Sequence, residues 1–261
     1  MVPVLPQSAN ISKKDESDPN LILVKPTSEL TMAHDAEARK PVIYYGTFIH
    51  CVAPTELSTQ HNSAVGVDES GEIVFIERGL SSQDQLSSVA SKHGWAEGTY
   101  TTVSFGTDKS RTSFFFPGFI DTHTHAPQYP NTGLFGSTTL LDWLSTYTFP
   151  LEASFHDLNR AHTVYNRVVR RSLAAGTTCA AYYGTIHVPA TNLLADICLK
   201  RGQRALVGRV CMDRMSPEDC RDHSAEQAIK DSEESGVYIE SIDPTGAVSY
   251  THLTLPTILR V

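Results

Sequence analysis

Apolar runs alternate with helix-like stretches from Pro117 onward, and this alternation restricts the fold more than any other feature of the chain. Runs typical of buried strands occupy residues 114–121, 177–184 and 204–212. Segments with helical spacing or helical end signals follow at 137–147, 157–175, 192–202 and 217–235. Strands that alternate with helices are typical of parallel α/β folds, most simply a (β/α) barrel.

The length of this region predicts only part of such a barrel. Eight βα units of a TIM-type barrel occupy about 250 residues, whereas 145 residues follow Phe116 in this chain. We therefore predict the α/β class, with about the first three βα units of a (β/α)8 TIM-type barrel over residues 117–246.

Two segments of different composition precede the barrel region. Residues 1–40 are polar and rich in proline, and such a composition cannot bury enough apolar surface to offset the entropy of ordering. We expect them to form a flexible extension. Short β-rich runs separated by turns follow, and they predict a small β domain over 41–116, part of a β-sandwich.

Charge and cysteine content exclude several classes of protein. The formal net charge is -8 and no stripe of Lys or Arg is present, so we expect no nucleic-acid partner. No apolar stretch approaches the roughly 18 residues of a membrane helix, and the N-terminus does not resemble a secretory signal. The five cysteines are scattered without a CxxC pair, which favours a reducing compartment. We predict a cytoplasmic protein without a membrane partner.

Two histidines end the first apolar run of the barrel region. In a strand, alternate residues face one side, so Asp121, His123 and His125 are expected to project together at the carboxyl end, where barrel active sites lie. Two imidazoles placed in this way can bind one divalent metal, typically zinc, which activates a water molecule. The simpler alternative is an ordinary pair of histidines, one in the core and one near a turn.

The stretch "FFFPGFIDTHTHAPQY" resembles the first-strand motif PGxxDxHxH of the amidohydrolase superfamily. Together with "LLDWLSTYTFPLE", "VYNRVVRRSLAAGTTCAAYYGTIH" and "LLADICLKRGQRALVGRVCMD", it is similar to the guanine deaminases, from about Tyr44 to Gly246. The resemblance implies one zinc ion per active site, bound by His123 and His125. It also implies a base pocket lined by His125, Ala126, Pro127 and Gln128, in which the Gln128 amide contacts the purine edge.

The same resemblance implies hydrolytic deamination of guanine to xanthine and ammonia, an activity of purine catabolism, and a homodimer in the full-length form. Guanine deaminases take two further histidines, an aspartate and a proton-transferring glutamate from later strands, so no catalytic acid or base is assigned here. Residues 247–261 do not resemble the family, and we expect a foreign, artefactual tail. We therefore expect this chain to be truncated and inactive.

Two other functions stay open. One is another amidohydrolase, either a deaminase or a chlorohydrolase, which activity assays of a Gln128 variant would separate from a guanine deaminase. The other is a non-catalytic barrel remnant, which metal analysis would identify. His187 follows the second strand of the barrel region, but the family does not use this position as a ligand.

Overall fold

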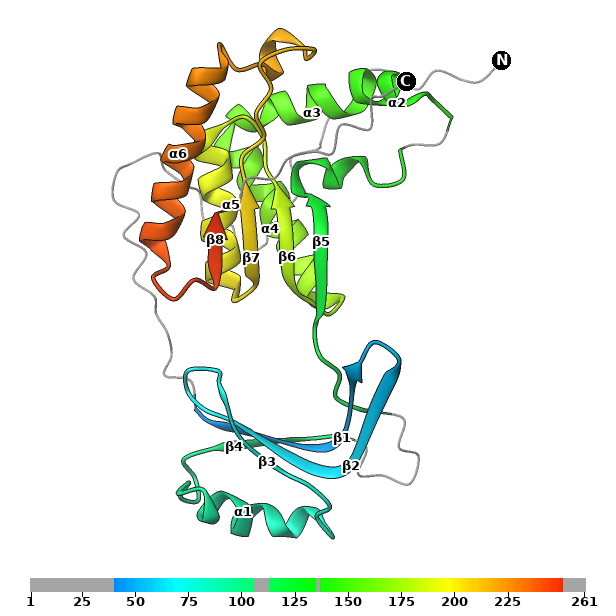
Figure 1. Cartoon of the computed structure of the whole chain (residues 1–261), viewed down its shortest axis with the longest axis vertical. Coiled ribbons are helices and arrows are strands. Elements are labelled where there is room, and N and C mark those ends of the chain that lie inside the picture. The colour runs from blue at the N-terminus through cyan, green and yellow to red at the C-terminus, as the bar shows by residue number, and fades with distance from the viewer. Residues whose placement is uncertain (1–39, 106–112, 135–136, 251–261) are drawn as a thin grey trace, which may run out of the picture.

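The computed structural model of the protein describes residues 40–105, 113–134 and 137–250, which form two separate four-stranded sheets (Figure 1). The extension expected over 1–40 lies outside these residues, apart from Lys40. Within the described part, no helix is long and apolar enough to cross a membrane.

The first sheet has the strand order β3-β2-β1-β4. Its strands are β1 (Val42–Ala53), β2 (Glu56–Val67), β3 (Ile73–Glu77) and β4 (Thr101–Ser104). The pairs β1–β2 and β2–β3 are antiparallel, whereas β4 runs parallel to β1. The short, polar β4 was not predicted, because its sequence has no run of apolar residues.

A helix, and not a second sheet, covers this β sheet. The short segment η1 (Gln83–Gln85) leads into α1 (Leu86–Lys92). Leu86 and Val89 of α1 pack against Ile43, Tyr45 and Phe75 of the sheet. The described residues therefore form a two-layer α/β unit, and the expected sandwich is not observed among them. The amphipathic helix supplies the second apolar layer that a lone sheet needs.

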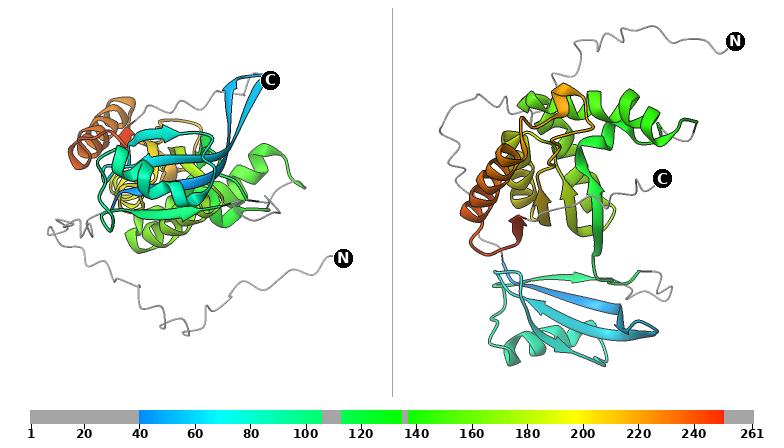
Figure 2. Two further views of the ribbon diagram at one scale, coloured as in Figure 1. Left: turned by 90° about the horizontal axis from the view of Figure 1, so that it is seen from below. Right: turned by 45° about the horizontal axis from the view of Figure 1, so that its top comes forward.

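The second sheet is parallel, and its strands follow one another in sequence order, β5-β6-β7-β8. Its strands are β5 (Phe119–His125), β6 (Thr177–Tyr183), β7 (Arg204–Gly208) and β8 (Val248–Tyr250). The long helices that connect them are α4 (Leu158–Ala174), α5 (Val188–Arg201) and α6 (Ala225–Ile242), which lie along the sheet (Figures 1 and 2). The mixed α/β class is thus confirmed.

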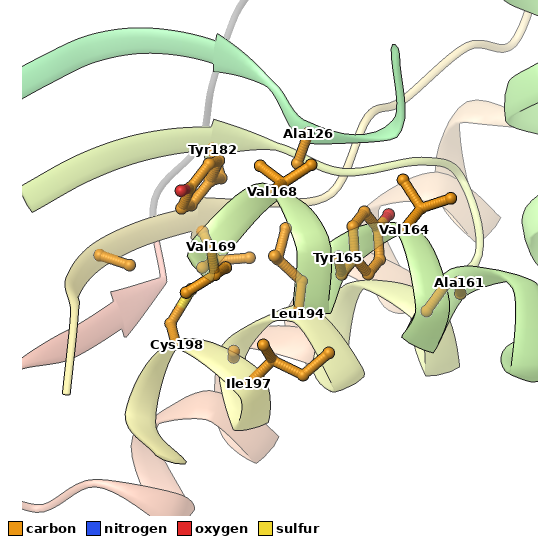
Figure 3. Packing of buried hydrophobic residues seen from close by; sticks show 14 of the residues in the cluster. Ala126, Ala161, Val164, Tyr165, Val168, Val169, Tyr182, Leu194, Ile197 and Cys198 are labelled. Atoms are coloured by element: carbon orange, nitrogen blue, oxygen red, sulfur yellow. The ribbon is translucent and has the colours of Figure 1, made fainter. Parts of the chain in front are cut away.

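The main hydrophobic core lies between this sheet and its helices. Tyr182 of β6 is fully buried there with Tyr165 and Val169 of α4 and Leu194 of α5 (Figure 3). Side chains alternate across a strand, so Tyr183, the next residue of β6, faces the opposite side of the sheet. The helices therefore cover one face, and the other face is left for the functional site.

Shorter elements connect β5 to α4 and β7 to α6. After β5 come η2 (Ala126–Asn131), α2 (Leu140–Trp143), the π-helical η3 (Leu144–Thr148), α3 (Phe149–Ala153) and η4 (Ser154–His156), and before α6 comes η5 (Glu218–Cys220). The helix predicted over 217–235 begins later, because Ser224 caps it by accepting a hydrogen bond from the Gln227 amide.

The segment 247–261, which we expected to be a foreign tail, begins inside the parallel sheet. Val248, Ser249 and Tyr250 form β8 beside β7, and the Val248 amide donates to the Asp243 carboxylate at 2.8 Å. The rest of this segment lies outside the described residues. Its expected foreign origin stays a prediction, although its first residues complete a fourth strand.

Gly118, in the Pro-Gly pair before β5, lies against Thr178 of β6. A Cβ atom at this glycine would lie 2.0 Å from Thr178 Oγ1 and 2.7 Å from Thr178 Cβ. We expect Gly118→Ala to destabilise the fold by about 1–3 kcal/mol, as overpacking does, and urea unfolding measures the effect. The same change should cost less in a Thr178→Gly background, and an equal cost in both backgrounds would exclude this contact as the cause.

Candidate functional site

Strand β5 places His123 and His125 on the sheet face that the helices leave uncovered. Their Nε2 atoms lie 3.1 Å apart. The pairing of β5 with β6 is irregular between Asp121 and Thr124, and the His123 amide donates to Asp121 Oδ1 at 3.0 Å. The predicted convergence of the two imidazoles is confirmed, whereas the Asp121 carboxylate turns back to the strand's own backbone.

An aromatic side chain of the neighbouring strand supports both imidazoles. The ring of Tyr183 stacks on His125 with centroids 4.6 Å apart and an interplanar angle of 10°, and it lies 4.6 Å from the His123 ring at 34°. Tyr183 is itself buried. The three rings restrict the directions in which the histidine nitrogens can point.

The surroundings of His125 favour the neutral imidazole that a metal requires. Burial, and next the positive charge of His123, lower the pKa of His125 to about 4. Metal ligation needs a deprotonated ring nitrogen, and two such nitrogens at 3.1 Å fit adjacent ligand positions around one ion. The residues present therefore fit half of a zinc site.

Within the described residues, no group of three or more His, Cys, Asp or Glu side chains is arranged to hold a metal ion. Catalytic zinc sites use three protein ligands and keep a position for water. His123 and His125 thus supply two ligands, and no third one comes from the described part of the chain.

Gln128 lies beside the histidines and contacts a buried acid. Its Nε2 atom is 3.2 Å from His125 Nδ1 and 2.9 Å from Glu152 Oε1. Gln128 lies on η2, one turn after β5, and Glu152 lies on α3, where it is 6% exposed. The site therefore contains a carboxyl group that sequence reasoning did not assign to it.

The other two residues of the predicted base pocket are buried. Ala126 has no exposed surface and belongs to the hydrophobic core, near Val168 of α4 (Figure 3). Pro127 is also buried. They fix the start of η2 and hence the position of Gln128. Substrate contact by Ala126 and Pro127 stays a prediction, and a side-chain role is not supported for Ala126.

Glu152 resists ionisation in the folded protein. Burial raises its pKa from 4.5 to about 7, and the hydrogen bond from Gln128 offsets only part of this rise. A carboxyl group with a raised pKa is typical of functional sites, although structural networks produce it too.

The raised pKa of Glu152 predicts a pH-dependent stability. The folded state binds this proton more tightly than the unfolded state, so its contribution is complete below pH 4.5 and is lost as the pH rises to about 7. The difference corresponds to about 3 kcal/mol. We expect Glu152→Gln to remove this decline, and urea unfolding at pH 5 and pH 8 measures it. An unchanged difference between the two pH values would contradict the prediction.

His187 lies in a different hollow. It lines a cleft of about 460 Å³ with His156, Asp231 and Glu234, among other residues, and neither His123 nor His125 lines it. Its Nδ1 atom lies 3.0 Å from the Thr185 hydroxyl. The structure therefore does not join His187 to the histidine pair, and its expected lack of a ligand role stays a prediction.

A buried ion pair secures the loop that follows β7. Arg209 pairs with Asp222, and their side chains are 1% and 3% exposed. Arg209 also donates to the Ile186 carbonyl at 2.7 Å, and Asp222 accepts from the Met212 amide at 2.8 Å. These contacts tie the ends of β6 and β7 together with the loop before α6.

Glu152 and Tyr183 are the site residues that sequence reasoning missed. Glu152 follows "TFPL" in a stretch that reads as an ordinary helix end, and Tyr183 lies within an apolar strand run. Strand alternation is the one signal that marks Tyr183, because it places this residue opposite the core residue Tyr182. Nothing in the spacing marks the contact between Gln128 and Glu152.

The family model for the "Amidohydrolase family" matches residues 114–260, and the chain belongs to this family. The match includes the first strand with both histidines. It also spans most of the segment 247–261, so the boundary expected at that segment stays untested.

Among its relatives, the chain is 41% identical over 202 residues to a probable guanine deaminase of Schizosaccharomyces pombe, covering 77% of this chain and 37% of the relative. It is 41% identical over 196 residues to the guanine deaminase of Dictyostelium discoideum, covering 74% and 42%. The crystal structure of guanine deaminase from C. acetobutylicum with bound guanine matches with a TM-score of 0.64 and 25% identity, covering 80% and 45%. The chain thus spans less than half the length of each.

Proposed function

We propose that the chain is the N-terminal part of a guanine deaminase, a hydrolase that acts on C–N bonds of cyclic amidines. The observation that carries this proposal is the pair of histidine Nε2 atoms 3.1 Å apart with Gln128 at 3.2 Å from His125. This arrangement occurs in a chain about 41% identical to proteins described as guanine deaminases.

The parallel sheet is proposed to be half of a (β/α)8 barrel. Its four strands follow in sequence order with connecting helices along it, as in a barrel wall. His123 and His125 then face the barrel interior at the carboxyl ends of the strands. A homodimer and a cytoplasmic location are proposed as well, and the five free cysteines are consistent with a reducing compartment.

Each residue of the site has a defined task in this proposal. His123 and His125 would hold the zinc ion, and Tyr183 would fix the planes of their rings. The ion, when bound, lowers the pKa of water and so supplies a nucleophile near neutral pH. Gln128 would orient guanine through hydrogen bonds of its amide.

The test is an activity assay of a completed barrel. Residues 1–246 are joined to the part of the Dictyostelium discoideum relative that follows its residue equivalent to Gly246, and ammonia release from guanine is measured with zinc present. Conversion of guanine, but not of the triazine substrates of chlorohydrolases, is expected. Triazine turnover without guanine turnover would favour the alternative amidohydrolase, and a metal-free, inactive product would favour the non-catalytic remnant.

A further inference from the structure

A line of polar contacts connects the histidine pair to a buried carboxyl group. His123 Nε2 lies 3.1 Å from His125 Nε2, and Gln128 Nε2 lies 3.2 Å from His125 Nδ1 and 2.9 Å from Glu152 Oε1. One end of the Gln128 amide therefore faces His125 and Glu152 at once. The protonation state of Glu152 therefore restricts the position of the ring hydrogen on His125, and the reverse also holds.

One arrangement satisfies every group while Glu152 is ionised. The amide nitrogen of Gln128 donates one hydrogen to Glu152 and the other to His125 Nδ1. His125 then carries its ring hydrogen on Nε2 and donates it to His123. This arrangement is stable without metal, but His125 Nε2 has no lone pair to offer.

A second arrangement frees both Nε2 atoms. In this arrangement the amide oxygen of Gln128, and not its nitrogen, lies between His125 and Glu152. The amide group must rotate to exchange its oxygen and nitrogen positions. The oxygen accepts from Nδ1–H of His125 and from a protonated Glu152 carboxyl. A histidine that binds a metal through Nε2 needs a hydrogen-bond acceptor for Nδ1–H. Among the described contacts of His125 Nδ1, Gln128 supplies this acceptor.

We propose that Glu152 is a positioning residue for the histidine pair: it sets which end of the Gln128 amide faces His125, and hence which ring nitrogen of His125 is free to bind a metal. This inference rests on the metal role given to His123 and His125 under the proposed function. In the change to the metal-binding arrangement, Glu152 takes up one proton from solvent, while His125 moves its ring hydrogen from Nε2 to Nδ1 and stays neutral.

Among the titratable groups that interact with Glu152, it is Glu152 itself that changes charge near neutral pH. Tyr165 of α4 and Cys220 of η5 both interact with it electrostatically. Burial first, and Glu152 among the further causes, raise the pKa of Tyr165 well above 10 and that of Cys220 to about 12. Both are therefore neutral at pH 6–9. The pKa of Glu152 is about 7.

The experiment compares zinc affinities of the 261-residue chain and its Glu152→Gln variant by calorimetry between pH 6.5 and 8.5. The amide of the variant can donate to Gln128 at every pH, whereas Glu152 must first be protonated. The ratio of the variant's affinity to that of the parent chain is expected to rise roughly 20-fold over this range. Glu240→Gln, an exposed change on α6, is the matched control and should give a constant ratio.

A second measurement does not depend on zinc. Nitrogen-15 NMR of the metal-free chain reports which ring nitrogen of His125 carries the hydrogen, and His125→Ala assigns the signal. We expect the hydrogen on Nδ1 at pH 6 and on Nε2 at pH 8.5 in the parent chain, with no such change in Glu152→Gln.

The two measurements separate the two proposals. A constant affinity ratio, or a His125 hydrogen on the same nitrogen at both pH values, overturns the role of Glu152. If the tautomer changes as expected but the completed barrel described above also holds no zinc, the metal role of the histidines is overturned, and the control of His125 by Glu152 holds on its own.

Discussion

Replacing His123 or His125 by alanine in the completed barrel is expected to reduce guanine turnover by more than about a thousandfold, since a zinc site lowers the pKa of water from 15.7 to about 7. Each change removes one of the two Nε2 atoms that converge to 3.1 Å. The measurement pairs ammonia release with metal content, and both should fall together.

The control for this prediction is His50→Ala, which removes an imidazole from β1 in the other sheet. It should leave turnover and metal content within about twofold of the parent, because His50 is only partly buried and lies outside the site. Activity that survives the loss of either His123 or His125 would remove the basis for the proposed metal centre.

Replacing Asp222 by alanine is expected to destabilise the chain by about 3–5 kcal/mol, because it leaves the buried Arg209 charge without its partner. Arg209 retains its hydrogen bond to the Ile186 carbonyl, but its remaining acidic partner is Asp231, which is partly exposed and lies 3.4 Å away. The free energy of unfolding in urea measures the loss, and the loop between β7 and α6 should become sensitive to protease.

Two variants separate the ion pair from its surroundings. Asp219→Ala changes an exposed acid of η5 and should alter the unfolding free energy by less than about 0.5 kcal/mol. The double change Arg209→Met and Asp222→Leu removes both charges, and it should be closer to the parent than Asp222→Ala alone. A double variant as unstable as the single one would show that packing, and not the unpaired charge, causes the loss.

The parts of the fold that repeat a pattern could be predicted from the sequence. Apolar runs located β6 and β7, helical spacing located α4, and Gly202 ended α5 in a left-handed conformation, as its position predicted. The convergence of His123 and His125 followed from strand alternation alone. Each of these features depends on residues close together in the chain, so local rules suffice for them.

Other features depend on contacts between distant segments, and the sequence did not reveal them. Gln128 and Glu152 are 24 positions apart and meet because a series of short helical segments folds back over the end of β5. The pairing of β4 with β1 and the helical cover of the first sheet are of the same kind. Side-chain polarity alone also could not distinguish the buried Glu152 from the exposed acids of α6.

The sequential order of the parallel strands has a consequence for the timing of assembly. Each strand from β5 to β8 pairs with its immediate successor in the chain, so the sheet can form one strand at a time in the order of synthesis. His123, His125 and Tyr183 all lie on the first pair of strands. During synthesis the two imidazoles can therefore come together once β6 has left the ribosome, before the strands that follow it exist.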